Sequence, residues 1–275
     1  MPSVVMITGA SSGIGKSTAL KLLRRGYVVY GLARRIAEMA DIVQAGGVAL
    51  ELDVTKIDAV ERCVHRVIEE QGCVDVLVNN AGFGLSGPVE EVPPSRARYQ
   101  HDVNLFGVAR MTQLVLPHMR RAGRGRIVNL SSIGGVGSAP LGAWYPSTKF
   151  ALEGWSDCLR QEVQGFGIDV VVVCPGLTAL EFGEGVVRKP RANKSSPDKS
   201  SYASPIKTFH KQGRETFVSG QASSPQVIAD VIVKAIEAER PRTRYRAGYL
   251  SGALLLARRV LPDRWREALV PAQLR

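Results

Sequence analysis

The chain has 275 residues, of which 45% are hydrophobic and 28 are glycine, and this composition suits one large α/β domain with many tight turns and excludes a wholly disordered chain. The start lacks a basic region followed by a signal-peptide core, and the longest apolar run near the end, GALLLA, is far too short to span a bilayer. We therefore expect a soluble, cytoplasmic protein. Its formal net charge is +11.

This positive charge is concentrated near the end of the chain. From Arg240 to Arg275 there are nine arginines and two acidic residues, so nine minus two leaves +7 of the total +11. A basic segment can attract nucleic acid or anionic lipid. A solvated, arginine-rich surface is the more ordinary explanation, and we expect no nucleic-acid partner.

The cysteines and histidines form no metal-binding pattern. The four cysteines (Cys63, Cys73, Cys158 and Cys174) include no CxxC pair, and none of the four histidines stands at a ligand spacing from them. We interpret the cysteines as reduced thiols in a cytosolic protein and predict no metal site.

Apolar runs bounded by glycines alternate with amphipathic segments along the chain. The runs predict strands at 4–8, 27–32, 48–54, 74–82, 125–132 and 167–176, with an edge strand at 243–250. Helices are predicted at 13–25, 35–44, 58–71 and 98–120, from Tyr145 onward, and at 225–239. Continuous Val, Ile and Leu runs are typical of parallel strands buried on both faces. The alternation predicts a single doubly wound parallel sheet of the Rossmann type, with helices on both faces and right-handed connections.

Two segments depart from this alternation. Residues 183–224 are rich in Ser, Lys, Pro and Gly, and we interpret them as a long substrate loop within a catalytic domain that spans 1–248. Residues 249–275 form a basic amphipathic extension, in which Leu250, Leu254 and Leu261 share one helical stripe. We favour packing on the domain, or a lid over the substrate cleft, above contact with an anionic membrane.

A glycine-rich turn separates the first strand from the first helix. The sequence ITGASSGIGKS places Gly9, Gly13 and Gly15 there. Glycine permits positive φ and close approach of a pyrophosphate, and the following helix offers free N–H groups and the positive end of its dipole. This position, directly after a strand and opening a helix, predicts a nucleotide-binding site.

Tyr145 and Lys149 are four residues apart at the start of the fifth predicted helix. This spacing places them on one helical face, about one turn apart. A nearby cation lowers the pKa of a phenol, so the pair is suited to proton exchange near neutral pH. Taken alone, the same spacing also fits an ordinary surface helix.

Four motifs together decide between these interpretations. TGxxxGIG at 8–15, NNAG at 79–82, VNLFG around Asn104 and YxxxK at 145–149 occur in an order and spacing that resemble the short-chain dehydrogenase/reductase family. Ser132 also precedes Tyr145 by thirteen residues, as the serine of that family does. The similarity covers roughly residues 2–176 and is greatest to the branch that acts on retinoids, hydroxysteroids and other apolar carbonyls.

The resemblance implies a role for each of four residues. Tyr145 would protonate the carbonyl oxygen, and Lys149 would lower the pKa of Tyr145 and bind the nicotinamide ribose. Ser132, with Ser131 as the alternative, would hold the substrate oxygen. Asn104 would anchor a water that links Lys149 to solvent. Fixed donors at the oxygen where charge builds would lower the barrier.

The resemblance also implies a set of cofactor contacts at the ends of the strands. They are Gly9, Ser11, Ser12, Gly13, Ile14, Gly15, Asp53, Val54, Asn80, Ala81, Gly82, Tyr145, Lys149, Pro175, Gly176 and Thr178. After the second strand there is no acidic residue to hold a ribose 2′-hydroxyl, and Arg34 and Arg35 stand there instead. Arginine suits the 2′-phosphate of NADP(H), and we expect Arg34 to meet it because it follows the strand immediately.

Two departures from the family pattern affect the site. PGLTALEF places Thr178 and Leu180 out of the usual order, which puts the nicotinamide carboxamide contacts in doubt. Pro146 follows Tyr145 directly, and a proline there is tolerable only in the first turn of a helix.

The leading hypothesis is an NADPH-dependent carbonyl reductase, reversible as an alcohol dehydrogenase, that acts on an apolar ketone or aldehyde. The candidate pocket walls are Gly84, Leu85, Leu141, Trp144, Leu177 and Phe182. The alternatives are a non-catalytic NADP-binding regulator or scaffold, a sugar-nucleotide epimerase or dehydratase, and a peripheral membrane enzyme acting on a lipid-like alcohol. The resemblance further implies a homodimer or homotetramer.

Overall fold

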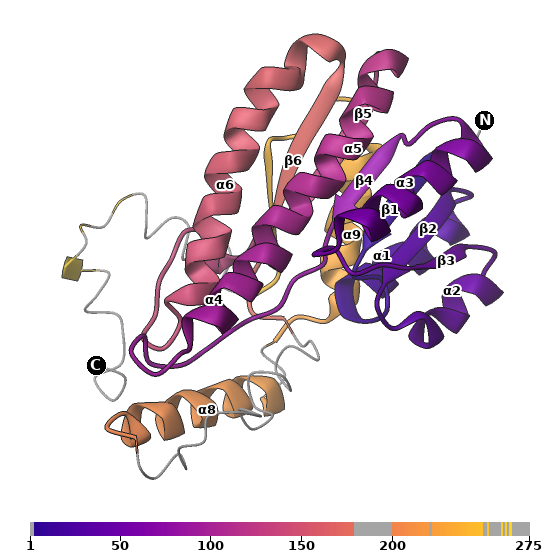
Figure 1. Ribbon diagram of the computed structural model, residues 1–275. Coiled ribbons are helices and arrows are strands. Elements are labelled where there is room, and N and C mark those ends of the chain that lie inside the picture. Colours follow the sequence, from indigo (N-terminus) through magenta and orange to yellow (C-terminus); the bar gives the residue numbers. More distant parts are fainter. Residues whose placement is uncertain are drawn as a thin grey trace.

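The structure is a computed structural model that describes residues 3–178, 200–219 and 222–249, together with residues 252, 260, 262, 264 and 265. Figure 1 shows a central sheet with helices on both sides and helix α8 below it. Within the described part of the chain, none of the helices is both long and apolar enough to cross a membrane.

The sheet has seven strands in the order β3-β2-β1-β4-β5-β6-β7, and all six pairings are parallel. The prediction of a doubly wound parallel sheet is therefore confirmed, and the expected edge strand is present as β7. The strands are β1 (Val4–Thr8), β2 (Val28–Ala33), β3 (Val48–Glu51), β4 (Val76–Asn79), β5 (Gly125–Leu130), β6 (Ile168–Pro175) and β7 (Arg244–Ala247).

Helices cover both faces of the sheet, because successive strand residues point to opposite sides and both sides are apolar. Val5 and Ile7 of β1 belong to one core, and Val4 and Met6 belong to the other. The first core includes α1 (Gly13–Arg24), α2 (Ala40–Gln44) and α9 (Pro225–Glu237). The second includes α3 (Ile57–Gln71), α5 (Gly107–Ala122) and α6 (Trp144–Val163).

The parallel pairing brings the carboxyl ends of the strands to one edge of the sheet. The order along the sheet reverses at β1, whose neighbours are β2 and β4. Ligands of open α/β sheets bind in the crevice at such a switch point. The glycine turn that follows β1 and the NNAG segment that follows β4 both lie there.

The helix predicted over 98–120 differs in its start and its continuity. It begins earlier, as α4 (Pro94–His101), passes through the π-helical segment η2 (Asp102–Phe106) and continues as α5. The wide turn accommodates one residue more than an α-helix does and includes Asn104, which is fully buried. The helix predicted over 35–44 likewise begins as a 3₁₀ turn, Ile36–Met39, before α2.

The predicted loop over 183–224 contains a helix that the composition of the segment did not predict. Helix α8 (Ala203–Val218) lies within it, so describing the whole segment as a loop was wrong. Pro205 stands in the first turn of α8, where the missing N–H costs no hydrogen bond. Residues 179–199, which include Leu180 and Phe182, lie outside the described residues, as does most of the extension over 249–275.

Candidate active site

The glycine turn after β1 has the geometry that a phosphate cradle requires. Gly9 and Gly13 have φ values of 68° and 56°, which side chains other than glycine rarely adopt. A Cβ added at Gly15 would lie 2.4 Å from the Gly9 carbonyl oxygen. Ser12 occupies the N-cap of α1 without a side-chain cap, so the first N–H groups of the helix face the turn. The residues present therefore fit a pyrophosphate.

Hydrogen bonds fasten this turn to the NNAG segment. The Asn80 amide donates to the carbonyl oxygens of Thr8 and Gly9 at 2.9 and 3.2 Å. The Thr8 hydroxyl oxygen accepts the backbone N–H groups of Asn80 and Ala81, both at 3.0 Å. Asn80 and Ala81 thus form one wall beside the glycine turn, next to Gly82.

Asn79 has a different role from its neighbour. Its amide donates to Thr112 of α5 at 3.2 Å and to Asn129 of β5 at 2.9 Å, away from the glycine turn. Asn129 in turn donates to Ser156 of α6 at 3.0 Å. This buried polar chain joins the sheet to α5 and to α6, the helix that carries Tyr145 and Lys149.

The two arginines after β2 diverge. The Arg35 guanidinium reaches over the glycine turn and donates to Ser12 Oγ at 3.1 Å and to Ser11 Oγ at 3.4 Å. The Arg34 guanidinium donates to the Tyr99 hydroxyl at 3.0 Å. The arginine that faces the glycine turn is therefore Arg35, whereas the sequence favoured Arg34.

Tyr145 lies in the first turn of α6, which explains why Pro146 is tolerated after it. The Ser132 side chain hydrogen-bonds to its phenol. Ser131 is buried without a partner for its hydroxyl, so the structure brings Ser132 rather than Ser131 to the phenol. A Cβ at Gly134 would lie 3.3 Å from the Tyr145 ring, and the glycine therefore lets the loop lie against that ring.

Burial governs the pKa of Tyr145. The surrounding protein disfavours the phenolate and raises the pKa of Tyr145 above its ordinary value, and the hydrogen bond from Ser132 only partly opposes this rise. The expectation that Lys149 lowers this pKa is wrong for this structure. The Lys149 ammonium lies 5.9 Å from the centre of the phenol ring and donates instead to the Leu130 carbonyl oxygen at 2.6 Å.

Lys149 is itself perturbed in the opposite direction. Its side chain is buried, and burial lowers the pKa of Lys149 to about 8, while Glu153 and Cys174 nearby oppose the shift. An amine that titrates near neutral pH is suited to relay a proton.

Asn104 connects the π-helical segment to α6. Its amide donates to the Phe83 carbonyl oxygen at 3.0 Å and to the Thr148 hydroxyl at 3.1 Å, and its Oδ1 accepts the Phe83 N–H at 3.0 Å. Thr148 immediately precedes Lys149. A Cβ at Gly82 would lie 3.2 Å from Asn104 Oδ1 and 3.8 Å from Lys149 Nζ, so these three residues meet at one point.

The remaining predicted cofactor residues also lie at this edge. Gly176, which follows Pro175, has no room for a side chain, because a Cβ there would lie 1.9 Å from the carbonyl oxygen of Tyr249, just after β7. The Thr178 hydroxyl turns back to the Gly176 carbonyl oxygen at 3.0 Å. Two further predicted contacts follow β3. There, Asp53 Oδ1 accepts the Thr55 hydroxyl at 2.8 Å, and Val54 is buried.

A cavity of about 410 Å³ lies beside the loop that leads into Tyr145. Its lining combines residues of the β4–α4 connection, of that loop, and of α8 and the turn before it: Pro88, Val89, Glu90, Pro140, Leu141, Tyr202 and Pro205. Of the five predicted pocket walls that lie within the described residues, Leu141 is the one that lines it. Leu141 has a φ of 62°, which is unusual for leucine, and its carbonyl oxygen accepts the Gly87 N–H at 2.8 Å.

Sequence reasoning missed three residues of this site. Gly134 makes room for the Tyr145 ring, Thr148 holds the Asn104 amide, and Glu153 acts on Lys149. Glu153 follows Lys149 by four residues, so the same helical spacing that paired Tyr145 with Lys149 was a signal for it.

Comparison of the sequence with known protein families and proteins identifies its relatives. Residues 3–190 match the family model described as short chain dehydrogenase. Over 95% of this chain and 94% of the relative, the sequence is 36% identical to a 3-ketodihydrosphingosine reductase of Bacteroides thetaiotaomicron. It is 34% identical to retinol dehydrogenase 8 of Bos taurus, over 89% of this chain and 81% of that protein.

The solved structures agree with the fold. A short-chain dehydrogenase from Streptomyces avermitilis superposes with a TM-score of 0.80 at 32% identity, covering 98% of this chain and 94% of that one. Among other solved structures of this fold, some hold NADP and one holds NAD.

Proposed function

Because the chain belongs to the short-chain dehydrogenase/reductase family, whose members are pyridine-nucleotide-dependent oxidoreductases, we propose that it is an NADP(H)-dependent reductase of a ketone or aldehyde on an apolar molecule. The reaction is reversible, with the corresponding alcohol as the substrate in the other direction. A long-chain ketone is the substrate class that we favour.

The observation that carries this proposal is the half-buried Ser132–Tyr145 pair with Lys149 one helical turn away. The nicotinamide, when bound, supplies the hydride to the carbonyl carbon. Tyr145 gives its phenolic proton to the carbonyl oxygen, and its raised pKa keeps that proton in place at neutral pH. Ser132 donates to the same oxygen and stabilises its developing charge.

Lys149 and Asn104 return the proton to Tyr145 in this proposal. The Lys149 ammonium is buried and has a pKa of about 8, so it exchanges protons readily near neutral pH. The Asn104 amide is fixed by its hydrogen bonds to Phe83 and Thr148. In this proposal it anchors the water that links Lys149 to solvent.

The preference for NADP(H) rests on positive charge at the end of β2. Arg35 stands over Ser11 and Ser12, where a 2′-phosphate would add charge-assisted hydrogen bonds. Arg34, which donates to the Tyr99 hydroxyl, remains the second candidate.

The apolar substrate class is supported by the cavity beside the loop into Tyr145. Among the described residues of its lining, Glu90 is the one with a charged side chain, and the others are proline, valine, leucine and tyrosine. Relatives similar over most of the chain bear the names 3-ketodihydrosphingosine reductase and retinol dehydrogenase. Both names denote long apolar substrates.

The test is NADPH oxidation by the purified full chain against a panel of ketones and aldehydes, with NADH in parallel. The panel contains 3-ketodihydrosphingosine, retinal, a steroid ketone, a short aliphatic ketone and a charged keto acid. We expect turnover of the apolar members with NADPH in preference to NADH, and no activity above that of the Tyr145→Phe variant on the keto acid. Turnover confined to the keto acid, or absent with every member, would overturn the proposal.

The homodimer or homotetramer implied by the family remains a prediction. We propose pairing through the surfaces of α5 and α6, where Phe106 at the start of α5 is 51% exposed. Size-exclusion chromatography with light scattering measures the state, and a Phe106→Glu variant should shift it toward the monomer.

A further inference from the structure

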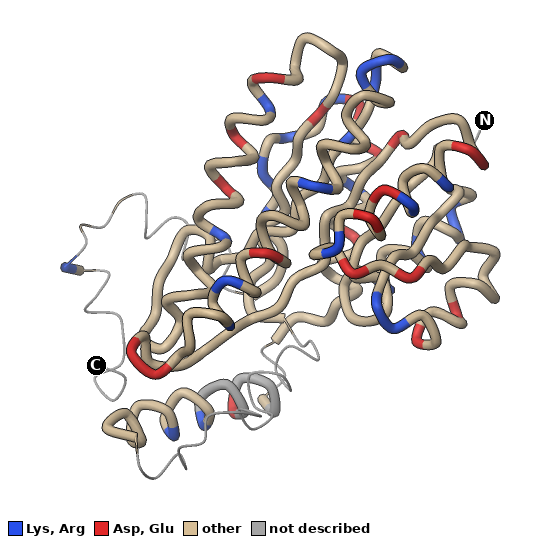
Figure 2. Tube along the Cα trace, viewed as in Figure 1, with Lys and Arg blue, Asp and Glu red and all other residues tan. Residues whose placement is uncertain are grey.

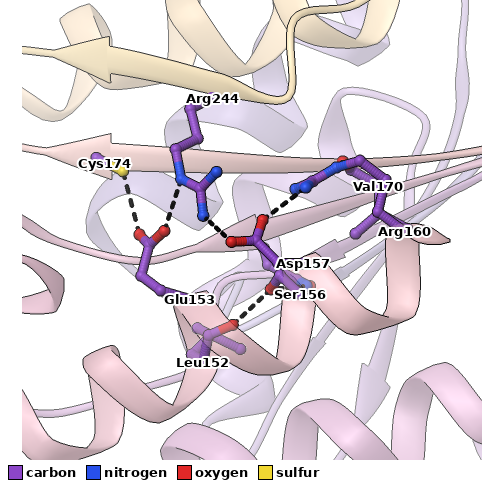
Figure 3. Close-up of polar contacts among 9 residues, drawn as sticks. Leu152, Glu153, Ser156, Asp157, Arg160, Val170, Cys174 and Arg244 are labelled. Atoms are coloured by element: carbon purple, nitrogen blue, oxygen red, sulfur yellow. Dashed lines mark hydrogen bonds and ion pairs between the residues drawn. The ribbon is translucent and has the colours of Figure 1, made fainter.

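A row of charged side chains runs along α6 away from the candidate catalytic centre. Lys149, Glu153 and Asp157 follow one another at intervals of four residues, and Arg160 comes three residues later. These intervals place them on one stripe of the helix. Figure 3 shows Glu153 and Asp157 side by side, with Arg244 of β7 reaching both.

Glu153 is the most enclosed carboxylate of this row, with 7% of its surface exposed. Its Oε2 accepts Arg244 Nε at 2.9 Å, and its Oε1 accepts the Cys174 thiol of β6 at 3.3 Å. From the side of Ser132, a Cβ at Gly135 would lie 3.1 Å from Glu153 Cγ. Neighbours on three elements thus fix the carboxylate one turn beyond Lys149.

A carboxylate that is buried and fixed in this way exerts its negative charge on the groups beside it. Lys149, one helical turn away, is such a group. The Lys149 ammonium is enclosed, and its hydrogen bond to the Leu130 carbonyl oxygen adds no opposite charge. We propose that Glu153 is a positioning residue that keeps Lys149 protonated during turnover, with Arg244 holding the carboxylate in place. This inference rests on the proposed function, because it assigns Glu153 to the same proton relay.

The charged and titratable groups around the pair are consistent with this assignment. Burial lowers the pKa of Lys149, and Glu153 is the larger of two influences that raise it, ahead of Cys174. Burial and Glu153 both raise the pKa of Cys174, so that group stays a neutral thiol. Arg244 and Arg246 of β7 act on Cys174 in the other direction.

Tyr145 faces Lys149 from the first turn of α6 with its pKa raised by burial, so the phenol is uncharged at neutral pH. The carboxylate of Glu153 is therefore the negative charge that acts on Lys149.

Asp157 supplies a matched control on the same helix. Its Oδ2 accepts Arg244 Nη2 at 2.6 Å, and its Oδ1 accepts Arg160 Nη1 at 2.6 Å. It lies two turns from Lys149 instead of one, and its side chain is 39% exposed. Replacing Asp157 by Asn removes one carboxylate from Arg244, as Glu153→Gln does, but leaves the surroundings of Lys149 intact.

The experiment compares wild type, Glu153→Gln and Asp157→Asn by two measurements. The first is the pH profile of kcat for the ketone that the wild type reduces best. The second needs no turnover and follows the ¹³Cε resonance of Lys149 with pH in lysine-labelled protein, assigned by its loss in a Lys149→Met variant. We expect Glu153→Gln to shift the basic limb and the resonance midpoint down by about one pH unit, the scale for removing a neighbouring opposite charge. Asp157→Asn should shift both by less than about a third of that.

Equal shifts in the two variants, or none in Glu153→Gln, would overturn the inference. If Glu153→Gln does not fold, the wild-type resonance still decides, since a Lys149 midpoint below pH 7 means that Glu153 does not keep it protonated. A wild type that reduces no carbonyl while Lys149 titrates as expected would remove the proposed function and leave the electrostatic coupling intact.

Discussion

Burial moves the phenol and the ammonium of the candidate centre in opposite directions. It raises the pKa of Tyr145 and lowers that of Lys149 to about 8, because in each case it disfavours the charged form. Tyr145 therefore keeps the proton that it donates at neutral pH, whereas Lys149, which is protonated below about pH 8, gives its proton up more easily than an ordinary lysine does.

The pH dependence of turnover should reflect Lys149. If the ammonium is the form that resupplies Tyr145, kcat for ketone reduction is constant well below pH 8 and falls as the pH rises through a midpoint near 8, where Lys149 loses its proton. The measurement is kcat at saturating NADPH between pH 6 and 10. A decline that begins only near pH 10 would assign the limb to another group.

Replacing Tyr145 by Phe keeps the ring that packs against Gly134 and removes the proton. We expect turnover to fall by at least ~100-fold, the scale of a positioned proton donor, and NADPH to bind within a few-fold of wild type. Turnover is measured by single-turnover kinetics, and binding by nucleotide fluorescence. Normal turnover in the variant would exclude Tyr145 as the acid.

Arg35 should determine the preference for NADPH over NADH. Arg35→Ala removes the guanidinium that lies over Ser11 and Ser12, and we expect the ratio of kcat/KM for NADPH to that for NADH to fall by about tenfold, the value of one charge-assisted hydrogen bond. Arg34→Ala is the matched control and should change the ratio less, because Arg34 is turned toward Tyr99. A larger effect of Arg34 would restore the expectation from the sequence.

At the scale of elements, replacing two helical glycines by alanine should have opposite effects on the free energy of unfolding. Gly15→Ala in α1 would place a Cβ 2.4 Å from the Gly9 carbonyl oxygen and 2.5 Å from Asn80 Nδ2. Gly154→Ala in α6 would meet no atom within 4 Å. We expect Gly15→Ala to cost ~1–3 kcal/mol of unfolding free energy and abolish NADPH binding, because steric overlap outweighs helix propensity.

The Gly154→Ala variant is the control for that substitution. It should add about 0.5–1 kcal/mol to the free energy of unfolding through backbone entropy and leave activity unchanged. Both values come from urea unfolding. Equal effects of the two changes would mean that the glycine turn relaxes around a methyl group.

The alternation of elements was predictable from the sequence because it depends on period and glycine punctuation alone. The strand at Val4–Thr8 and the helix that begins at Gly13 have the predicted limits to within a residue. The π-helical segment was not predictable from local sequence, and Asn104 within it hydrogen-bonds to Thr148, which lies 44 residues away. Helix α8 was hidden because its sequence is rich in polar residues and is flanked by Ser, Lys and Gly.

Some features of the candidate site were also predictable from the sequence, and others were not. The residue types at the strand ends were predictable, because carboxyl ends of parallel strands meet at one edge. The direction of each side chain was not, since Arg34 and Arg35 are adjacent in sequence and only packing separates them. The pKa of Tyr145 was expected to be lowered by Lys149 and is raised, because burial is a property of the whole fold.

At the scale of the whole molecule, three separate segments enclose one cavity. Figure 2 shows that acidic and basic residues are interspersed along the described helices and strands. Arg244 of the basic segment forms ion pairs with Glu153 and Asp157, and 38% of its side chain is exposed. The cavity lining is mainly apolar by contrast, which favours an extended hydrocarbon as its occupant.

Chain-length selectivity tests that assignment. Val89 lines the cavity and is 60% exposed, so Val89→Trp adds bulk there without disturbing the core. We expect KM for a long-chain ketone to rise by about tenfold, and KM for a short ketone to stay within about twofold, the scale for losing one or two buried methylenes. Val43→Trp on α2, where Val43 is 52% exposed, is the control and should change neither. A uniform rise would place the hydrocarbon elsewhere.

The π-helical segment between α4 and α5 also sets how this helix responds to changes in length. A π turn is equivalent to one residue inserted into an α-helix, and each helical residue advances the side chains by about 100°. The apolar stripe of α5, which carries Met111, Val115 and Met119, is therefore out of rotational phase with α4. Deleting one residue between Asp102 and Phe106 would restore regular helix and, with α4 fixed, swing that stripe away from the sheet. Genetic variation in this chain should accordingly tolerate substitutions in η2 far better than deletions, even though a deletion would yield the more regular helix.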